Sequence, residues 1–342
     1  MASDPRAWTV GDESAATMLA RLQASLPAFL VPPLHRVPLR AGNVVEIAGP
    51  SPSAKSHVLL QAVMHCILPK EWKGVHFGGL GKMVLYFDLD CRFDVLRLST
   101  ALRIRIMDAS GSACNVPLES KGGAGKIDIT AANMCAFDDE LFLACMRRFL
   151  YVRCYSTLEF LAALKTMHYQ LHKECEALGV MAHFLIIDSI GAYHWIDRGF
   201  QPSTLGDNRR KCLSLQIFTE AVVDEIRKLL QRQPLLVLAT KATIFGVGTP
   251  SKDRQRTVGK GSLQDMAELM TSTKETQKHQ YREYMPSVWQ SLVTHRIQLQ
   301  VSDGTITDTK DRSSIYTAEW ILPQLNHLDK FVIRDEGIFM LP

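Results

Sequence analysis

The chain has 342 residues, of which 46% are hydrophobic and 22% charged, so it can bury a large core and has no reason to be disordered overall. Its 39 basic residues are nearly balanced by 35 acidic ones, and a formal net charge of +4 is too small to indicate a nucleic-acid binder by itself. No apolar run approaches the roughly 20 residues that span a bilayer, and the N-terminus has no apolar signal core. We expect a soluble, non-secreted protein with one main domain.

The cysteines and histidines do not predict a metal site. Eight cysteines are scattered along the chain without a C-x-x-C pair, which is typical of reduced, buried thiols in an intracellular protein. His172 and Cys175 have the spacing of half a zinc site, but no second half follows at usable spacing.

In chain order, residues 1–41 predict an N-terminal extension with one short amphipathic helix within 13–30. From residue 42 to residue 342 we expect a core domain, in which short apolar runs alternate with segments that have apolar residues at helical spacing. The expected strands are 44–48, 83–90, 149–155, 183–189 and 234–240, and the expected helices are 55–68, 94–107, 157–178 and 208–231. This alternation predicts an α/β fold with a mostly parallel, doubly wound sheet buried on both faces.

The C-terminal part has a different pattern. Apolar runs at 291–301, 314–322 and 330–341 are not separated by helical segments, so we expect an antiparallel extension of the sheet. Three further stretches, rich in Gly, Ser and charged residues, predict mobile surface loops near 109–137, 191–211 and 242–284.

Residues 49–56, GPSPSAKS, lie between an expected strand and an expected helix and match the phosphate-loop pattern G-x-x-x-x-G-K-[ST] except at Ala54. In such a loop backbone N–H groups bind phosphate, the lysine reaches the terminal phosphates, and the following hydroxyl ligates magnesium. A left-handed conformation at Ala54 costs about 1 kcal/mol, and two prolines remove N–H donors. The pattern therefore predicts a weak site for ATP and Mg²⁺, with the nucleotide contacted by Gly49, Ser53, Ala54, Lys55 and Ser56 and the metal by Ser56 and Asp188. The alternative is a strand-to-helix turn with a surface lysine.

Several blocks together resemble the RecA-type recombinase superfamily, and within it the divergent recombinase paralogues of eukaryotic homologous recombination. The blocks are GPSPSAKS at 49–56, CILP at 66–69, FDLDCRFDVLRL at 87–98, IIDSIGAYHWIDR at 186–198, RKC at 210–212 and YMPSVWQSLVTHRI at 284–297. The resemblance implies a RecA-like P-loop ATPase core. It also implies a nuclear role in double-strand-break repair and meiotic recombination.

The chain departs from the active members of that superfamily at three positions. Active members resemble one another in a glutamate that activates the attacking water, where this chain has the shorter Asp90. They also end their fifth core strand in Asn-Gln, whose glutamine senses the terminal phosphate, and here Lys241 stands at that place. With Ala54, these departures predict that ATP hydrolysis is weak or absent.

The resemblance also implies partners. Two loops would bind single-stranded or branched DNA through Arg198, Arg209, Arg210 and Lys211 in the first and Lys252, Arg254, Arg256 and Lys260 in the second. Tyr193 and Trp195 either stack on bases or close the core above the sheet. Trp289 is expected to pack in the core. Arg296 either reaches a nucleotide or a neighbouring subunit, or pairs with an acidic side chain.

The residues before Val44 are too few for the N-terminal domain of the superfamily. The resemblance therefore implies a subunit that does not form a homo-polymer and that joins other recombinase paralogues, the D-type paralogue first among them. The short helix would contact such a partner or pack on its own core. Two other hypotheses stay open: a competent DNA-dependent ATPase that uses Lys55, Ser56, Asp90 and Asp188, and a phosphate-loop kinase of a small metabolite.

Overall fold

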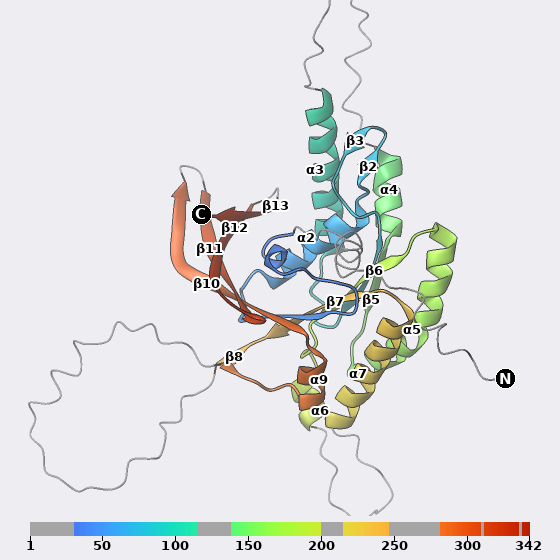
Figure 1. The fold of residues 1–342 in the computed structure, drawn as a ribbon, viewed down its shortest axis with the longest axis vertical. Helices are drawn as coiled ribbons and strands as arrows, with labels where there is room; N and C mark the ends of the chain where they lie inside the picture. The colour runs from blue at the N-terminus through green and yellow to red at the C-terminus, as the bar shows by residue number, and fades with distance from the viewer. Residues whose placement is uncertain (1–30, 115–137, 200–214, 246–280, 309–310, 335–336) are drawn as a thin grey trace, which may run out of the picture. The chain divides into compact units, whose positions relative to one another are not determined.

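The computed structural model describes residues 31–114, 138–199, 215–245, 281–308, 311–334 and 337–342 (Figure 1). The helix expected within 13–30 lies outside these residues. Of these described residues, those up to 242 and those from 285 onward belong to one compact unit, and the few between 243 and 284 belong to a second. In the second unit the short strands β8 (Ile244–Phe245) and β9 (Tyr281–Arg282) pair antiparallel.

The first unit is built on a nine-stranded sheet with the order β13-β12-β11-β10-β1-β7-β6-β4-β5. All five strands expected in the core are present, each displaced by at most two residues at either end. They are β1 (Val44–Gly49), β4 (Met83–Asp88), β5 (Phe149–Arg153), β6 (Ala182–Asp188) and β7 (Leu236–Ala242). All pairings among these five strands are parallel, which confirms the mostly parallel sheet.

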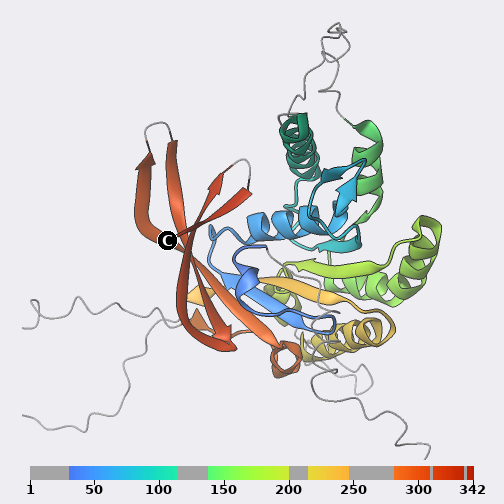
Figure 2. The same cartoon turned by 45° about the horizontal axis from the view of Figure 1, so that its top comes forward.

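Helices cover both faces of this sheet (Figures 1 and 2). On one face, residues of α2 (Lys55–Ile67), α3 (Val95–Cys114) and α4 (Asp139–Arg147) share a buried core with the strands. The opposite face is covered by α5 (Thr157–Leu178), α7 (Leu215–Arg232) and α9 (Ser287–Leu292). On that face the ring of Phe87 in β4 lies 5.1 Å from the ring of Phe160 in α5. The doubly wound α/β architecture is confirmed.

Local sequence explains where several helices begin and end. The Ser156 side chain accepts a hydrogen bond from the Glu159 N–H at the start of α5, and Gly179 takes the left-handed conformation at its end. Asp138 caps α4 in the same way by accepting from the Leu141 N–H at 2.9 Å. Neither α4 nor the short helices α6 (His194–Gly199) and α9 was predicted, because each is too brief to show helical periodicity.

The stretches expected to be loops are partly helical. Helix α3 continues to Cys114, and α6 occupies part of 191–211. A small hairpin of β2 (Glu71–Trp72) and β3 (Val75–His76) follows α2 and was also missed. Two-residue strands lack the alternation that would reveal them in the sequence.

The C-terminal strands extend the sheet as a meander. β10 (His295–Asp308) runs parallel to β1, and β11 (Asp311–Leu322), β12 (Gln324–Arg334) and β13 (Gly337–Leu341) follow antiparallel. The apolar run at 330–341 is divided between β12 and β13 rather than forming one strand. The predicted antiparallel extension is confirmed.

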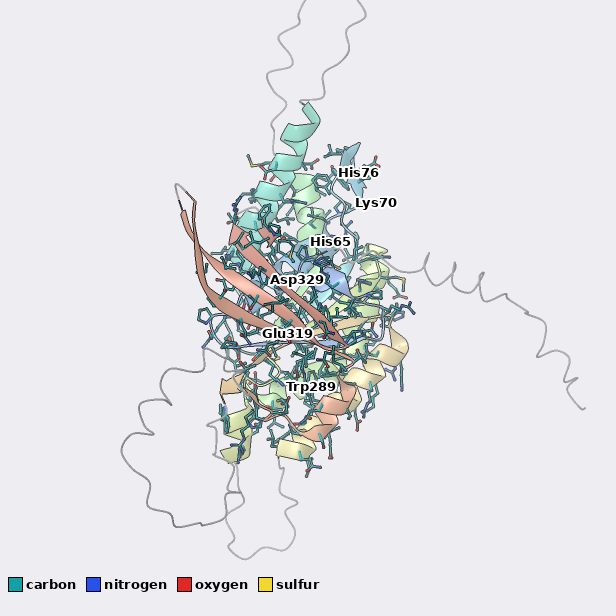
Figure 3. All side chains as sticks on the ribbon, turned by 60° about the vertical axis from the view of Figure 1, so that its left-hand side comes forward. His65, Lys70, His76, Trp289, Glu319 and Asp329 are labelled. Carbon is teal, nitrogen blue, oxygen red and sulfur yellow. The ribbon has the colours of Figure 1, made fainter. Side chains whose placement is uncertain are left out.

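The residues just before β1 pack on this meander. Leu34, in the 3-10 turn η2 (Leu34–Arg36), is fully buried, and the Arg36 guanidinium donates to the Asp329 carboxylate of β12 at 2.7 Å. Figure 3 labels Asp329 on these strands. The last part of the predicted N-terminal extension therefore belongs to the core.

Candidate functional site

The loop after β1 has the backbone conformation that its sequence makes unfavourable. Ala54 has φ 68° and ψ 5°, in the left-handed region where glycine is preferred. Gly49 is required for a different reason, because a Cβ atom there would lie 2.5 Å from the Leu299 carbonyl oxygen. Ala54 thus adopts the left-handed conformation that glycine takes at this position of the phosphate-loop pattern, at a cost of about 1 kcal/mol.

The Lys55 ammonium lies inside this loop. Its Nζ donates to the Gly49 carbonyl at 2.7 Å, to the Pro50 carbonyl at 2.9 Å and to Ser53 Oγ at 2.9 Å. Burial lowers the pKa of Lys55 to about 8, against the raising effect of the Asp188 and Asp90 charges. An ammonium has three hydrogens, so the amine must release loop oxygens before it can bind a phosphate.

Asp188 ends β6 beside this loop. It is 6% exposed, and its Oδ2 accepts a hydrogen bond from the Tyr86 hydroxyl at 2.8 Å while its Oδ1 accepts from the Thr240 hydroxyl. Burial raises the pKa of Asp188, and these two hydrogen bonds oppose the rise. Both oxygens therefore have neutral donors, which a hydrated magnesium ion would have to rearrange.

Asp90 follows β4 and is exposed. Desolvation by the surrounding protein raises its pKa, while a hydrogen bond from Ser189 and the charges of Arg92 and Lys55 lower it. The structure thus brings Lys55, Asp90 and Asp188 within electrostatic reach of one another. Ser56, the expected magnesium ligand, is exposed at the start of α2.

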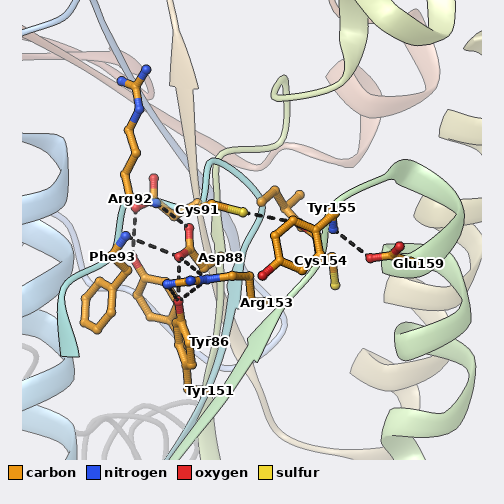
Figure 4. A network of polar contacts seen from close by, with 12 residues as sticks. Tyr86, Asp88, Cys91, Arg92, Phe93, Tyr151, Arg153, Cys154, Tyr155 and Glu159 are labelled. Atoms are coloured by element: carbon orange, nitrogen blue, oxygen red, sulfur yellow. Dashed lines mark hydrogen bonds and ion pairs between the residues drawn. The ribbon is translucent and has the colours of Figure 1, made fainter.

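The Asp88 carboxylate holds the turn that carries Asp90 (Figure 4). This role of Asp88 was not predicted from the sequence. Its carboxylate is fully buried and accepts from the Arg92 and Phe93 N–H groups, each at 3.2 Å, and from the Tyr151 hydroxyl at 2.6 Å. Arg153 Nε lies 3.6 Å from the same carboxylate. The available signal was the first aspartate of FDLD at 87–90, two residues before Asp90. Asp88 fixes the backbone from which Asp90 projects.

Lys241 lies on the other face of the sheet. Its neighbour Thr240 contacts Asp188, and successive strand residues point to opposite faces. The Lys241 Nζ lies 2.8 Å from Glu46 Oε1, and the Lys241 side chain is only 6% exposed. The structure does not bring Lys241 to Lys55, and its proposed phosphate-sensing role stays a prediction.

Glu46 is the centre of a buried cluster that the sequence did not reveal. Its Oε1 also lies 2.7 Å from Arg296 Nε, and its Oε2 accepts from Trp289 Nε1 at 2.8 Å. Trp289, labelled in Figure 3, is fully buried, which confirms its packing role. Of the two alternatives for Arg296, the structure shows the pairing with an acidic side chain.

The first predicted DNA loop is described only up to residue 199. Arg198 is exposed in α6, with its guanidinium carbon 5.6 Å from the centre of the Trp195 ring. Trp195 is 56% exposed, so the interpretation that it closes the core is wrong. Tyr193 is half-buried, and its hydroxyl lies within hydrogen-bonding distance of the Leu89 carbonyl, at 2.8 Å, and of the Cys154 carbonyl, so it is anchored beside the residues that follow β4 and β5. The remaining predicted contacts lie outside the described residues: Arg209, Arg210, Lys211, Lys252, Arg254, Arg256 and Lys260.

The described residues were also compared with the requirements of a metal site and of a membrane-spanning helix. Within the described residues, no group of three or more His, Cys, Asp or Glu side chains has the arrangement of a metal site. None of the helices in the described part of the chain combines the length and the apolar character that crossing a membrane requires.

The chain is similar in sequence to known DNA repair proteins. No model of a known protein family matches the chain. The chain is 46% identical over 336 residues to the DNA repair protein XRCC2 homolog of Arabidopsis thaliana, a match that covers 97% of this chain and 89% of that protein. It is 27% identical over 352 residues to the DNA repair protein XRCC2 of Mus musculus, with 99% of both chains covered.

Proposed function

The chain belongs to the XRCC2 family of DNA repair proteins, and from this premise we propose that it is a non-filament-forming recombinase paralogue with little or no ATP hydrolysis of its own. Its place is in a nuclear complex with other recombinase paralogues, the D-type paralogue first among them. That complex assists recombinase assembly on single-stranded or branched DNA during double-strand-break repair and meiosis.

The observation that carries the proposal is the hydrogen bonding of Lys55. All three of its contacts are with oxygens of its own loop, and the nearby Asp90 is one methylene shorter than a glutamate. Catalysis of phosphoryl transfer depends on positioned charge and an oriented water. Lys55 is already hydrogen-bonded to its own loop, and Asp90 is shorter than the glutamate of active members. Such a site supports nucleotide binding better than ATP hydrolysis.

The residues present fit ATP with Mg²⁺ in part. Lys55 would contact the terminal phosphates, Ser56 would ligate the metal, and Asp188 would hold a metal-bound water. ATP supplies a phosphoryl group and four negative charges at such a site, and binding would have to displace the loop oxygens from the lysine. We therefore propose weak nucleotide binding that organises the loop.

Steady-state phosphate release tests the proposal. Purified chain with single-stranded DNA is expected to release phosphate at the same rate as its Lys55→Ala variant. The Asp90→Glu variant is the matched probe, because it restores the longer carboxylate without changing charge. Turnover in the unmodified chain that is lost in Lys55→Ala would instead support the second hypothesis, a DNA-dependent ATPase, which the grouping of Lys55, Asp90 and Asp188 favours.

Co-purification tests the complex. We expect the natively isolated chain to carry at least one recombinase paralogue in fixed stoichiometry, with subunits and nucleotide content read by native mass spectrometry. A chain that is isolated free of every recombinase paralogue would end the proposal.

A further inference from the structure

A groove of about 340 Å³ lies on the surface between α5 and α7, two helices that run side by side in Figures 1 and 2. Its floor is formed by Leu164 and Leu229, which are both buried. Its rim is formed by Lys165, His168, Glu225, Lys228 and Arg232. The groove lies on the face of the sheet opposite α2, and none of its residues belongs to a site predicted from the sequence.

The groove has an excess of positive charge. Of the lining residues, the one carboxylate, Glu225, is already paired, because Lys228 Nζ lies 2.8 Å from its Oε1. Neither Lys165 nor Arg232 has an ion-pair partner among the described residues, and both side chains are exposed. Lys228 and Arg232 lie near the C-terminus of α7, where cations also stabilise the helix dipole. The helix dipole does not account for Lys165, because this residue lies in the middle of α5.

The chemistry of the rim suits phosphate groups. Arginine binds phosphate oxygens in a bidentate manner, and lysine supplies a mobile point charge. The volume lies at the lower end of ligand sites, which range over roughly 300–1,000 Å³. All four basic or imidazole side chains are exposed, so they are accessible to a ligand that is larger than the groove itself.

We propose that this groove binds the phosphate backbone of a nucleic-acid strand. The proposed site lies on the helical face of the core and uses no residue of the loops at 191–211 and 242–262, for which DNA binding stays a prediction. It requires neither nucleotide binding nor a recombinase partner, so it stands apart from the proposed function. A free polyphosphate or an acidic peptide carries the same negative charge, so the experiments below distinguish these ligands from nucleic acid.

The test compares two double variants that remove the same charge from the same two helices. Lys165→Gln with Arg232→Gln changes the groove, whereas Lys173→Gln with Arg227→Gln changes exposed cations outside it. At about 50 mM salt we expect the groove variant to bind single-stranded oligonucleotide about tenfold more weakly, with the log–log salt slope less steep by about 1.4. The control should change less than about twofold. Equal losses in both variants, or no loss in either, would overturn the proposal.

A second measurement uses the unmodified full chain and does not depend on how the variants fold. Lysine labelling by an amine-reactive reagent should be slowed by an oligothymidylate at Lys165 and Lys228 and unchanged at Lys173. Inorganic pyrophosphate and polyglutamate, at matched charge concentration, should give no protection. Protection by pyrophosphate would assign the groove to free polyphosphate, and protection by polyglutamate to an acidic peptide; each result overturns the assignment to nucleic acid.

Discussion

Two buried carboxylates, Asp188 and Glu46, are stabilised in different ways on the two faces of the sheet. They lie on β6 and β1, on either side of β7, whose adjacent residues Thr240 and Lys241 reach one carboxylate each. Asp188 accepts hydrogen bonds from neutral hydroxyls, whereas Glu46 is paired with Lys241 and Arg296. Neutral donors can be exchanged for water or a metal at modest cost, and a buried ion pair cannot lose a partner cheaply. The Asp188 face can therefore respond to a ligand, while the Glu46 face holds the sheet.

The largest effect is expected at Glu46. Glu46→Gln leaves the Lys241 and Arg296 cations without their anion, so it should lower the free energy of unfolding by about 3–5 kcal/mol. Urea denaturation measures this loss. The matched control is Glu225→Gln, whose ion pair has the same 2.8 Å separation but an exposed lysine, and which should lose less than about 1 kcal/mol. Similar losses of unfolding free energy in Glu46→Gln and Glu225→Gln would contradict the view that the buried ion pairs of Glu46 hold the sheet.

A smaller effect is expected for Tyr86→Phe. The change leaves a buried oxygen of Asp188 without its donor and should cost about 1–3 kcal/mol of stability. Tyr151→Phe is the control, because Asp88 keeps two backbone donors and the Arg153 contact. Thermal unfolding of the two variants checks the order, and an equal or larger loss in Tyr151→Phe would contradict it.

The pH dependence of nucleotide binding tests whether the charged amine of Lys55 binds the phosphates. Burial lowers its pKa to about 8 in the free protein, and bound phosphate favours the charged amine, so affinity should be retained below that pKa and lost above it. From about pH 7 to about pH 9 the dissociation constant should rise about tenfold, which is about 1.4 kcal/mol. Titration of a fluorescent ATP analogue measures it. Lys55→Arg should flatten the profile, and an unchanged slope in that variant would assign the titration to another group.

The smallest effect is expected at Ala54. Ala54→Gly relieves the left-handed strain and should raise the stability by up to about 1 kcal/mol. Ala162→Gly, at an exposed position within α5, should instead lower it by about 1 kcal/mol. Chemical denaturation distinguishes the two, and a loss of stability in Ala54→Gly would show that the loop is not strained at that residue.

Much of the fold could be predicted because the relevant signals are local. The five core strands are continuous apolar runs, and α5 begins at a capping serine and ends at a glycine, as its sequence indicates. The grouping of Lys55 with Asp188 was also predictable, since both follow parallel strands whose carboxyl ends meet at one edge. Short elements such as α6, and the hairpin of β2 and β3, lack the length that periodicity needs.

By itself, the sequence determined the α/β alternation and the place of the loop between β1 and α2, and it predicted a phosphate site there with three departures at Ala54, Asp90 and Lys241. Only the tertiary structure decided which charges meet. Trp289 contacts Glu46 across 243 positions of sequence, and the direction of Lys241 depends on which face of β7 is turned to α9. Such contacts follow from packing between distant segments, for which a single sequence carries no local pattern.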